Sequence, residues 1–162
     1  MKTLPTPRHG DFRMPGEFEP HRGCMMIWPY RPGSWPFGAE NARRAFAAVA
    51  SAISESEAVY LLTRPEDIAE AKEIAPGRIR IVPMESDDAW ARDTGPTFVT
   101  DRKGELFGVD WQFNAWGGTY NGLYSHWERD DKIASSFCAY LGGPSLDARP
   151  FVLEGGSIHS DG

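Results

Sequence analysis

The chain has 162 residues, of which 41% are hydrophobic and 25% charged, so it can bury a sizeable core and is not expected to be disordered. Its net charge of −6 argues against nucleic acid as a partner, because phosphate binding needs a basic face. No stretch approaches the roughly 20 apolar residues of a membrane span, and the polar, proline-rich start lacks the apolar core of a secretory signal. We therefore expect a cytoplasmic protein without membrane contacts.

The first half of the chain alternates predicted strands and helices after an irregular, proline-punctuated arm over residues 1–20. Continuous or alternating apolar runs predict the strands, and apolar residues at steps of three and four predict the helices. In chain order these elements are a strand at 24–28, a helix at 41–54, a strand at 58–62, a helix at about 65–74 and a strand at 78–82.

The second half predicts a hairpin, a long loop, a helix and a last strand. These elements are a hairpin of 97–100 and 106–111, a loop over 114–127, a helix at 130–141 and a strand that begins at 150–153. Residues 154–161 continue in a strand pattern that places His159 and Asp161 on one face, and the pattern breaks off at Gly162 without a closing element. We interpret this ending as a truncated chain. The order of elements predicts an α/β fold with a mixed sheet.

The most informative stretch is 87–96, which directly follows the predicted strand at 78–82, where open α/β sheets usually bind ligands. Within seven residues it holds three aspartates, an arginine and Trp90. A carboxylate can grip a guanidinium with two parallel hydrogen bonds, and an indole face adds roughly 0.5–2 kcal/mol. Asp93 and Trp90 are therefore candidates for binding a planar cation. The alternative is that Asp93 forms a structural ion pair or caps a helix.

Glu154 precedes two glycines at the end of an apolar strand, so it is either a second carboxylate of the cleft or a solvated turn residue. His159 and Asp161 could be a base with its orienting acid or a fragment of a metal site. Two ligands do not make a zinc site, and the other histidines lack ligand spacing, so we predict no metal. The simpler interpretation of this pair is a polar strand end.

Cys24 and Cys138 are too few for a disulfide framework and are expected to be reduced. Cys24 begins an apolar run, and Cys138 follows the predicted core residue Phe137 on a helix. Both are expected to behave as small hydrophobic residues rather than as nucleophiles.

Five stretches, in family order, resemble the agmatine deiminase family of the guanidino-group-modifying (pentein) superfamily. They are residues 12–20, 26–29, 88–96, 113–118 and 153–159. The resemblance covers essentially all of residues 1–162 and corresponds to the N-terminal part of a family member, a little under half of its length. It implies a fold of ββαβ-type modules with pseudo-fivefold symmetry. Residues 1–162 would then be the N-terminal part of a single catalytic domain that includes the arm over 1–20.

The resemblance also implies hydrolysis of agmatine to N-carbamoylputrescine and ammonia, without metal or organic cofactor. A cysteine thiolate would attack the guanidinium carbon and form a covalent intermediate. Such an enzyme would serve putrescine biosynthesis and polyamine metabolism. In this sequence Asp93 matches a guanidinium-binding aspartate, Trp90 the aromatic residue of the cleft and Glu154 a further active-site carboxylate. Trp116, in the stretch 113–118, is a further candidate for substrate binding.

Two motifs of the family are absent from this sequence. The nucleophile belongs to a late Gly-Gly-Gly-Asn-Ile-His-Cys motif, and the catalytic histidine to an Asn-Gly-His-x-Asp motif. His159 and Asp161 belong instead to the earlier Glu-Gly-Gly motif, so we do not assign the acid–base role to them. The chain is therefore expected to be inactive unless a second polypeptide supplies the other half.

Three alternatives remain open. A peptidylarginine or arginine deiminase-like enzyme would use the same chemistry, but a substrate carboxylate calls for a cation, and the loop over 114–127 has no Arg or Lys. The loop therefore favours agmatine. A non-catalytic module could instead bind sugars or cations on an aromatic platform of Trp90, Trp111, Trp116 and Trp127, with Asp93 and Glu154 as polar contacts. The third alternative is a degenerate fragment that has no function of its own. A homo-oligomer is compatible with each of these alternatives.

Overall fold

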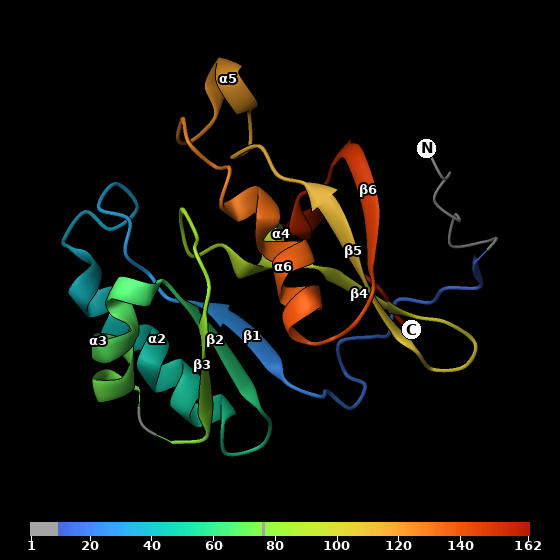
Figure 1. Cartoon of the computed structure of the whole chain (residues 1–162), viewed down its shortest axis with the longest axis horizontal. Helices are drawn as coiled ribbons and strands as arrows, with labels where there is room; N and C mark the ends of the chain where they lie inside the picture. The colour runs from blue at the N-terminus through green and yellow to red at the C-terminus, as the bar shows by residue number, and fades with distance from the viewer. Residues whose placement is uncertain (1–9, 76) are drawn as a thin grey trace. The chain divides into compact units, whose positions relative to one another are not determined.

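The computed structural model describes residues 10–75 and 77–162. They divide into two compact units, one formed by residues 20–91 and the other by residues 92–162 together with the stretch before residue 20 (Figure 1). Of the arm predicted over 1–20, residues 1–9 lie outside the described residues. From residue 11 to residue 19 the described chain forms turns and one isolated bridge, from Arg13 to Thr100.

The unit of residues 20–91 is a three-stranded parallel sheet with two helical connections. Its elements are β1 (Cys24–Ile27), α2 (Ala39–Ile53), β2 (Val59–Thr63), η1 (Pro65–Asp67), α3 (Ile68–Ile74) and β3 (Ile79–Pro83). The strand order is β1-β2-β3, and both pairings are parallel. Parallel neighbours need long crossovers, which α2 and α3 supply. All five predicted elements of this stretch are confirmed to within two residues.

Small residues bring the helices close to this sheet. Ala47 of α2 and Ala71 of α3 are buried against Leu61 of β2 and against Trp28, which follows β1. The three- and four-residue steps of α2 predict an apolar stripe of Phe46, Val49, Ala50 and Ile53. Ala50 is buried, as predicted, together with Ala47, but Val49 is 51% exposed, because neighbouring positions on a helix are 100° apart and Val49 falls on the outer side.

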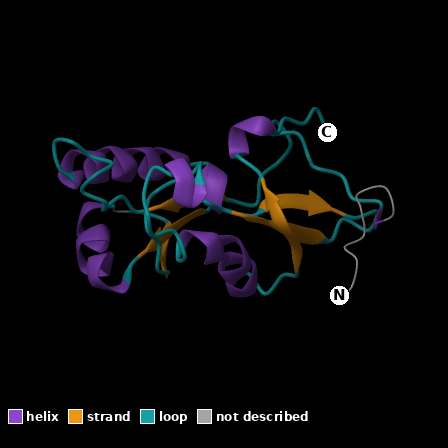
Figure 2. Ribbon diagram, turned by 90° about the horizontal axis from the view of Figure 1, so that it is seen from above, coloured by secondary structure: helices purple, strands orange, loops and turns teal. Residues whose placement is uncertain are grey.

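The unit of residues 92–162 follows the order strand, strand, helix, strand. Its sheet has β4 (Thr97–Thr100) antiparallel to β5 (Leu106–Gln112), and β5 parallel to β6 (Ser145–Val152). Between β5 and β6 lie α5 (Gly118–Asn121), η2 (Asp130–Lys132) and α6 (Ile133–Tyr140). α4 (Ala91–Thr94) begins the unit and η3 (Gly155–Ser157) follows β6. The α/β class with a mixed sheet is confirmed, and Figure 2 shows the helices and strands of the chain. The elements of this sheet follow the expected ββαβ order.

Three expectations for this unit are wrong. β6 begins at Ser145, five residues before the predicted start, and the chain after residue 157 forms no strand, so the shared strand face of His159 and Asp161 does not exist. The three-residue step from Phe137 predicts that Tyr140 faces the core, but Tyr140 is 50% exposed. The start of β6 has only two apolar residues, Leu146 and Ala148, too few to predict a strand, and its pairing with β5 depends on contacts between distant segments.

An ion pair between a buried aspartate and a more exposed arginine holds β6 to β5. Between Asp147 and Val152 the strand bulges, with four residues opposite a single residue of β5. The bulge brings the Arg149 guanidinium 2.7 Å from the carboxylate of Asp110, which is 3% exposed. Burial raises the pKa of the Asp110 carboxyl, and the hydrogen bond from Arg149 opposes that rise. Arg149 also lies 3.7 Å from Asp131.

Among residues 10–75 and 77–162, no helix combines the length and the apolar character that crossing a bilayer requires. The longest, α2, has 15 residues and carries two arginines and a glutamate.

Arg149→Met should destabilise the chain by about 3 kcal/mol at neutral pH, because it leaves the Asp110 carboxylate buried without its cation. The loss should shrink as the pH falls toward about 4, since a buried carboxyl with a raised pKa holds its proton more tightly in the folded state than in the unfolded state. Denaturant melts at several pH values measure both effects.

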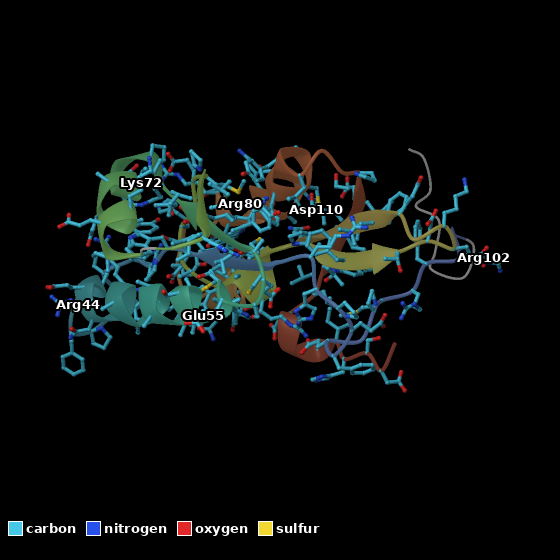
Figure 3. All side chains as sticks on the ribbon, turned by 90° about the horizontal axis from the view of Figure 1, so that it is seen from below. Arg44, Glu55, Lys72, Arg80, Arg102 and Asp110 are labelled. Atoms are coloured by element: carbon cyan, nitrogen blue, oxygen red, sulfur yellow. The ribbon has the colours of Figure 1, made fainter. Side chains whose placement is uncertain are left out.

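The matched control is Arg102→Met, at the β4–β5 turn (Figure 3). Arg102 pairs with Asp11 at 2.8 Å, but its side chain is 79% exposed, so its loss should cost less than about 1 kcal/mol. If the two variants lose the same free energy of unfolding, the pair of Arg149 with Asp110 stabilises the chain no more than an exposed ion pair does.

Candidate functional site

In the unit of residues 20–91, the loops that follow β1 and β3 are joined at the carboxyl end of the sheet. The Tyr30 hydroxyl donates to the carbonyl of Ser86 at 2.7 Å, and the Arg31 guanidinium donates to the carbonyl of Asp87 at 3.2 Å. The guanidinium carbon of Arg64, which follows β2, lies 3.3 Å from the centre of the Tyr30 ring. This is the edge of the sheet where the sequence predicted a ligand site.

Asp88 is a fully buried carboxylate within this joint, with 0% exposure. It accepts hydrogen bonds from the Ser34 hydroxyl, from the Ala89 amide at 2.8 Å and from the Trp90 indole nitrogen at 2.9 Å. The Trp90 side chain remains 38% exposed, so it is the half-buried aromatic that the sequence predicted. Sequence reasoning did not single out Asp88, because its partner Ser34 lies 54 residues away.

In the other unit, Asp93 lies on α4 and is partly buried. Its carboxylate accepts a hydrogen bond from the Gly155 amide at 3.1 Å. Its neighbour Arg92 donates to the carbonyls of Gly155 at 3.2 Å and Ile158 at 3.3 Å, and pairs with Glu17 at 2.8 Å. The contacts of α4 therefore bring Asp93 directly to the turn that carries Glu154.

Glu154 is exposed and immediately precedes η3, where its carbonyl accepts from the Ser157 amide at 2.8 Å. Its carboxylate has no hydrogen bond or ion pair with any other residue in the described part of the chain. Gly155 is buried, and a Cβ there would lie 2.4 Å from Cγ and 2.5 Å from the carbonyl oxygen of Arg92. The glycine is needed for this close approach of the two segments.

Trp116 lies in a strained part of the long loop. Ala115 and Trp116 both adopt positive φ, at 52° and 58°, a region that costs non-glycine residues about 1–2 kcal/mol each. The loop is closed by hydrogen bonds from the Leu123 amide to Ala115 at 2.8 Å and from the Gly118 amide to Asn114 at 2.7 Å. Such strain is typical of functional segments.

Two neighbouring acids of η2 hold the two ends of this loop. The carboxylate of Asp131 accepts from the Phe113 amide at 2.7 Å, and the buried Asp130 accepts from the Tyr124 hydroxyl at 2.6 Å. The Trp116 ring packs edge-on against Phe113 and Tyr124, with ring centres 5.1 and 6.4 Å apart. The structure thus places Trp116 in the aromatic cluster of the loop.

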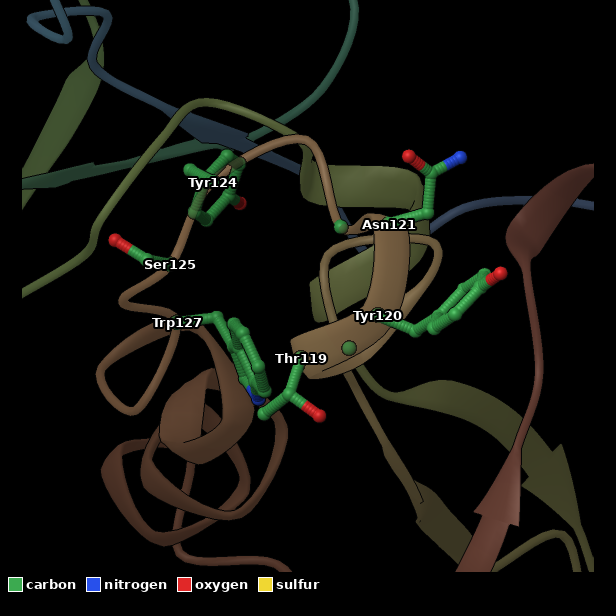
Figure 4. Close-up of a pocket in the computed structure, with 8 residues that line it drawn as sticks. Thr119, Tyr120, Asn121, Tyr124, Ser125 and Trp127 are labelled. Atoms are coloured by element: carbon green, nitrogen blue, oxygen red, sulfur yellow. The ribbon is translucent and has the colours of Figure 1, made fainter.

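The loop also lines an open pocket of about 360 Å³ (Figure 4). Its lining has no charged side chain and consists of Gly118, Thr119, Tyr120, Asn121, Gly122, Tyr124, Ser125 and Trp127. The side chain of Tyr120 is 98% exposed. The cavity suits an uncharged or aliphatic part of a ligand, held by aromatic faces and hydroxyl groups.

The remaining candidates are the two cysteines and the pair of His159 and Asp161. Burial, and then the charge of Asp110, raises the pKa of the Cys138 thiol to about 11, and burial raises that of Cys24. His159 and Asp161 are exposed. Across the described ranges there is no group of three or more His, Cys, Asp or Glu side chains that could hold a metal ion.

Comparison with known proteins identifies similar chains. Residues 13–162 match the family model of the Porphyromonas-type peptidyl-arginine deiminases. A Listeria monocytogenes protein named "Putative agmatine deiminase 1" is 48% identical over 163 residues, which are 100% of this chain and 45% of that protein. The solved agmatine deiminase of Enterococcus faecalis is 44% identical and superposes with a TM-score of 0.93, over 97% of this chain and 43% of that one.

A more distant solved structure is the agmatine deiminase of C. jejuni, which is 23% identical and superposes with a TM-score of 0.76. The match covers 93% of this chain and 44% of that one. At this identity the similarity shows the fold alone. The pentein fold implied by the resemblance is confirmed by these similarities. The chain spans a little less than half the length of the curated relatives it matches.

Gly155→Ala should destabilise the chain by about 1–3 kcal/mol, because the added methyl group overlaps Arg92 and pushes the Glu154 turn away from Asp93. Gly156→Ala is the matched control, since a Cβ at Gly156 meets no atom within 4 Å. Denaturant melts of the two variants measure the difference. Equal stabilities would contradict the close approach of the two segments.

Neither cysteine should react readily with iodoacetamide in the native chain. With a pKa of about 11, Cys138 is a thiolate in roughly one molecule in a thousand at pH 8, and the raised pKa of Cys24 acts in the same direction. Mass spectrometry after timed labelling checks this, with the urea-unfolded chain as the control that labels at both sites. Rapid native labelling of either cysteine would contradict the expectation.

Proposed function

Because the chain belongs to the Porphyromonas-type peptidyl-arginine deiminase family, we propose that it is the N-terminal part of a single catalytic domain that hydrolyses agmatine to N-carbamoylputrescine and ammonia. The observation that carries this proposal is the hydrogen bond from the Gly155 amide to Asp93, which brings Asp93 to the turn of Glu154. Two carboxylates on adjoining segments suit a planar cation that has donors on several sides. The 44% identity to the solved Enterococcus faecalis agmatine deiminase supports agmatine as the substrate.

In this proposal Asp93 grips the guanidinium and Glu154 supplies the second carboxylate. The Gly155 amide fixes one Asp93 oxygen, so the carboxylate plane is oriented before the cation arrives. Glu154 has the exposure that an incoming ligand requires. Trp90 offers a half-exposed indole face for stacking, and Trp116 is a further substrate-binding candidate.

The reaction needs a thiolate that attacks the guanidinium carbon, a proton donor for the departing ammonia and a water molecule that releases the product from sulfur. The thiols of the partly buried Cys24 and the buried Cys138, with raised pKa values, are unsuited to the first step. We therefore assign substrate binding and orientation to this chain. The nucleophile and the acid–base histidine come from residues outside it, and neither a metal nor an organic cofactor takes part.

Peptidylarginine is the second candidate substrate, and the description of the family model favours it. A substrate that carries a carboxylate would need a cation near the loop over 114–127, whose cavity lining has no charged side chain. In the aromatic-platform alternative, the indole nitrogen of Trp111 donates to the Thr97 hydroxyl at 3.0 Å, as that of Trp90 donates to Asp88, and both ring faces stay in the alternative. The 44% identity to the solved Enterococcus faecalis agmatine deiminase and the uncharged cavity lining favour agmatine.

The proposal includes a cellular compartment and a metabolic role for the enzyme. Both cysteines are free, which suits a reducing compartment, and we place the enzyme in the cytoplasm. N-carbamoylputrescine is a precursor of putrescine, so the reaction would serve polyamine metabolism. A homo-oligomer is compatible with these features.

Asp93→Asn should weaken agmatine binding by the chain roughly 10- to 100-fold, the loss that follows when a hydrogen bond to a charged group is removed. The control is Asp161→Asn, which changes an exposed aspartate in the same unit as Asp93. It removes the same charge and should leave agmatine binding unchanged. Isothermal titration calorimetry compares the variants.

A colorimetric assay for the ureido product should detect no turnover by any of these chains. If Asp93→Asn and Asp161→Asn bind agmatine equally well, Asp93 does not grip the guanidinium. Turnover by the 162-residue chain would contradict the assignment of the nucleophile to residues outside it.

A further inference from the structure

Resting on the proposed function, we propose that Asp88 is a positioning residue for Trp90. Its buried carboxylate fixes the orientation of the indole ring and makes the exposed ring face a stronger binding surface for a planar cation. Asp88 itself touches no substrate in this arrangement and acts through the hydrogen bond of 2.9 Å that the Trp90 indole nitrogen donates to it.

The hydrogen bonds around Asp88 leave its carboxylate little freedom. The Ala89 amide donates to one oxygen at 2.8 Å, while the Ser34 hydroxyl and the Trp90 indole share the other. The donors come from two different loops, so the carboxylate cannot rotate without breaking bonds to both. With 0% exposure, Asp88 has no water to replace a lost donor. The indole is therefore anchored at its N–H edge while 38% of the Trp90 side chain remains exposed.

The loop that carries Ser34 is itself held in place. Tyr30 and Arg31, at the start of that loop, donate to the carbonyls of Ser86 and Asp87, the two residues before Asp88. Arg64 lies against the face of the Tyr30 ring. The frame that fixes Asp88 thus draws on the ends of all three strands of the parallel sheet.

A carboxylate achieves more here than a neutral acceptor would. Hydrogen bonds to ionised acceptors are about twice as strong as those between neutral groups, so the ring resists tilting. The negative charge at the N–H edge also pushes electron density into the indole, and a more negative ring face attracts cations more strongly. Burying the Asp88 carboxylate costs free energy. Stronger cation binding at the Trp90 ring face gives this buried charge a function.

The test compares binding of methylguanidine, a planar cation, with binding of methylurea, its neutral isostere, by the chain and by Asp88→Asn. We expect the variant to bind methylguanidine about three- to tenfold more weakly, within the range of a cation–π contribution, and methylurea unchanged. The Trp90 indole proton, assigned in ¹H–¹⁵N spectra with Trp90→Phe, should move upfield. A purely structural role would not separate the two ligands.

Glu55→Gln is the matched control for the charge change. Glu55 lies in the same unit and is exposed (Figure 3), so its loss alters the long-range potential equally but leaves Trp90 untouched. It should bind methylguanidine as the unaltered chain does. A loss as large as that of Asp88→Asn would mean that net charge alone explains the effect, and it would overturn the inference.

The outcomes separate the inference from the function on which it rests. If the unaltered chain binds methylguanidine and Asp88→Asn binds it equally well, the inference is overturned and the proposed function stands. If the unaltered chain binds no guanidinium ligand, both are overturned. Should Asp88→Asn fail to fold, the decisive variant carries benzothienylalanine in place of Trp90, which keeps the ring but replaces the N–H by sulfur. Its unchanged affinity for methylguanidine would overturn the inference.

Discussion

Buried aspartates must be satisfied by hydrogen bonds, and three of them hold this molecule's distant segments together. Asp88, Asp110 and Asp130 are 0, 3 and 1% exposed. Each would cost several kcal/mol if it lost its partners inside the protein. Asp88 joins the loops after β1 and β3, Asp110 holds the bulge of β6 through Arg149, and Asp130 holds the long loop through Tyr124. These contacts fix the two joined loops, the strand bulge and the long loop in place.

The acids divide into two groups by exposure. The buried ones have donors from the protein and serve as fixed points. Asp93 is partly buried and Glu154 is exposed, so a ligand can reach them, and only these two were assigned to the cation. Gly155 brings Asp93 and Glu154 together, because its lack of a side chain lets the Glu154 turn rest on the backbone of Arg92. In the proposed function a positively charged ligand meets the carboxylate of Asp93, whose position the Gly155 amide sets beforehand, and this lowers the entropy lost on binding.

The sequence predicted elements whose evidence is local and missed those that depend on distant partners. The helix α2 and the strand β2 follow from apolar spacing, and both were found to within two residues. The first half of β6 has only two apolar residues, Leu146 and Ala148, so its strand depends on the pairing with β5 more than on its own pattern. For the same reason Asp88 and Asp110 could not be recognised as buried, since their partners Ser34 and Arg149 lie far along the chain. The site candidates came from residue chemistry and family resemblance, which need no tertiary contact.

The long loop shows what its anchors make possible. Two consecutive non-glycine residues, Ala115 and Trp116, adopt positive φ at a combined cost of about 2–4 kcal/mol. The aromatic packing within the loop and the hydrogen bonds to Asp130 and Asp131 together offset this cost. Those acids also lie at the start of the helical segment that leads into α6, where negative charge is favourable. One short acidic turn therefore stabilises a helix and holds a strained aromatic loop, and such strain persists where a fixed placement of the aromatic residues serves a function.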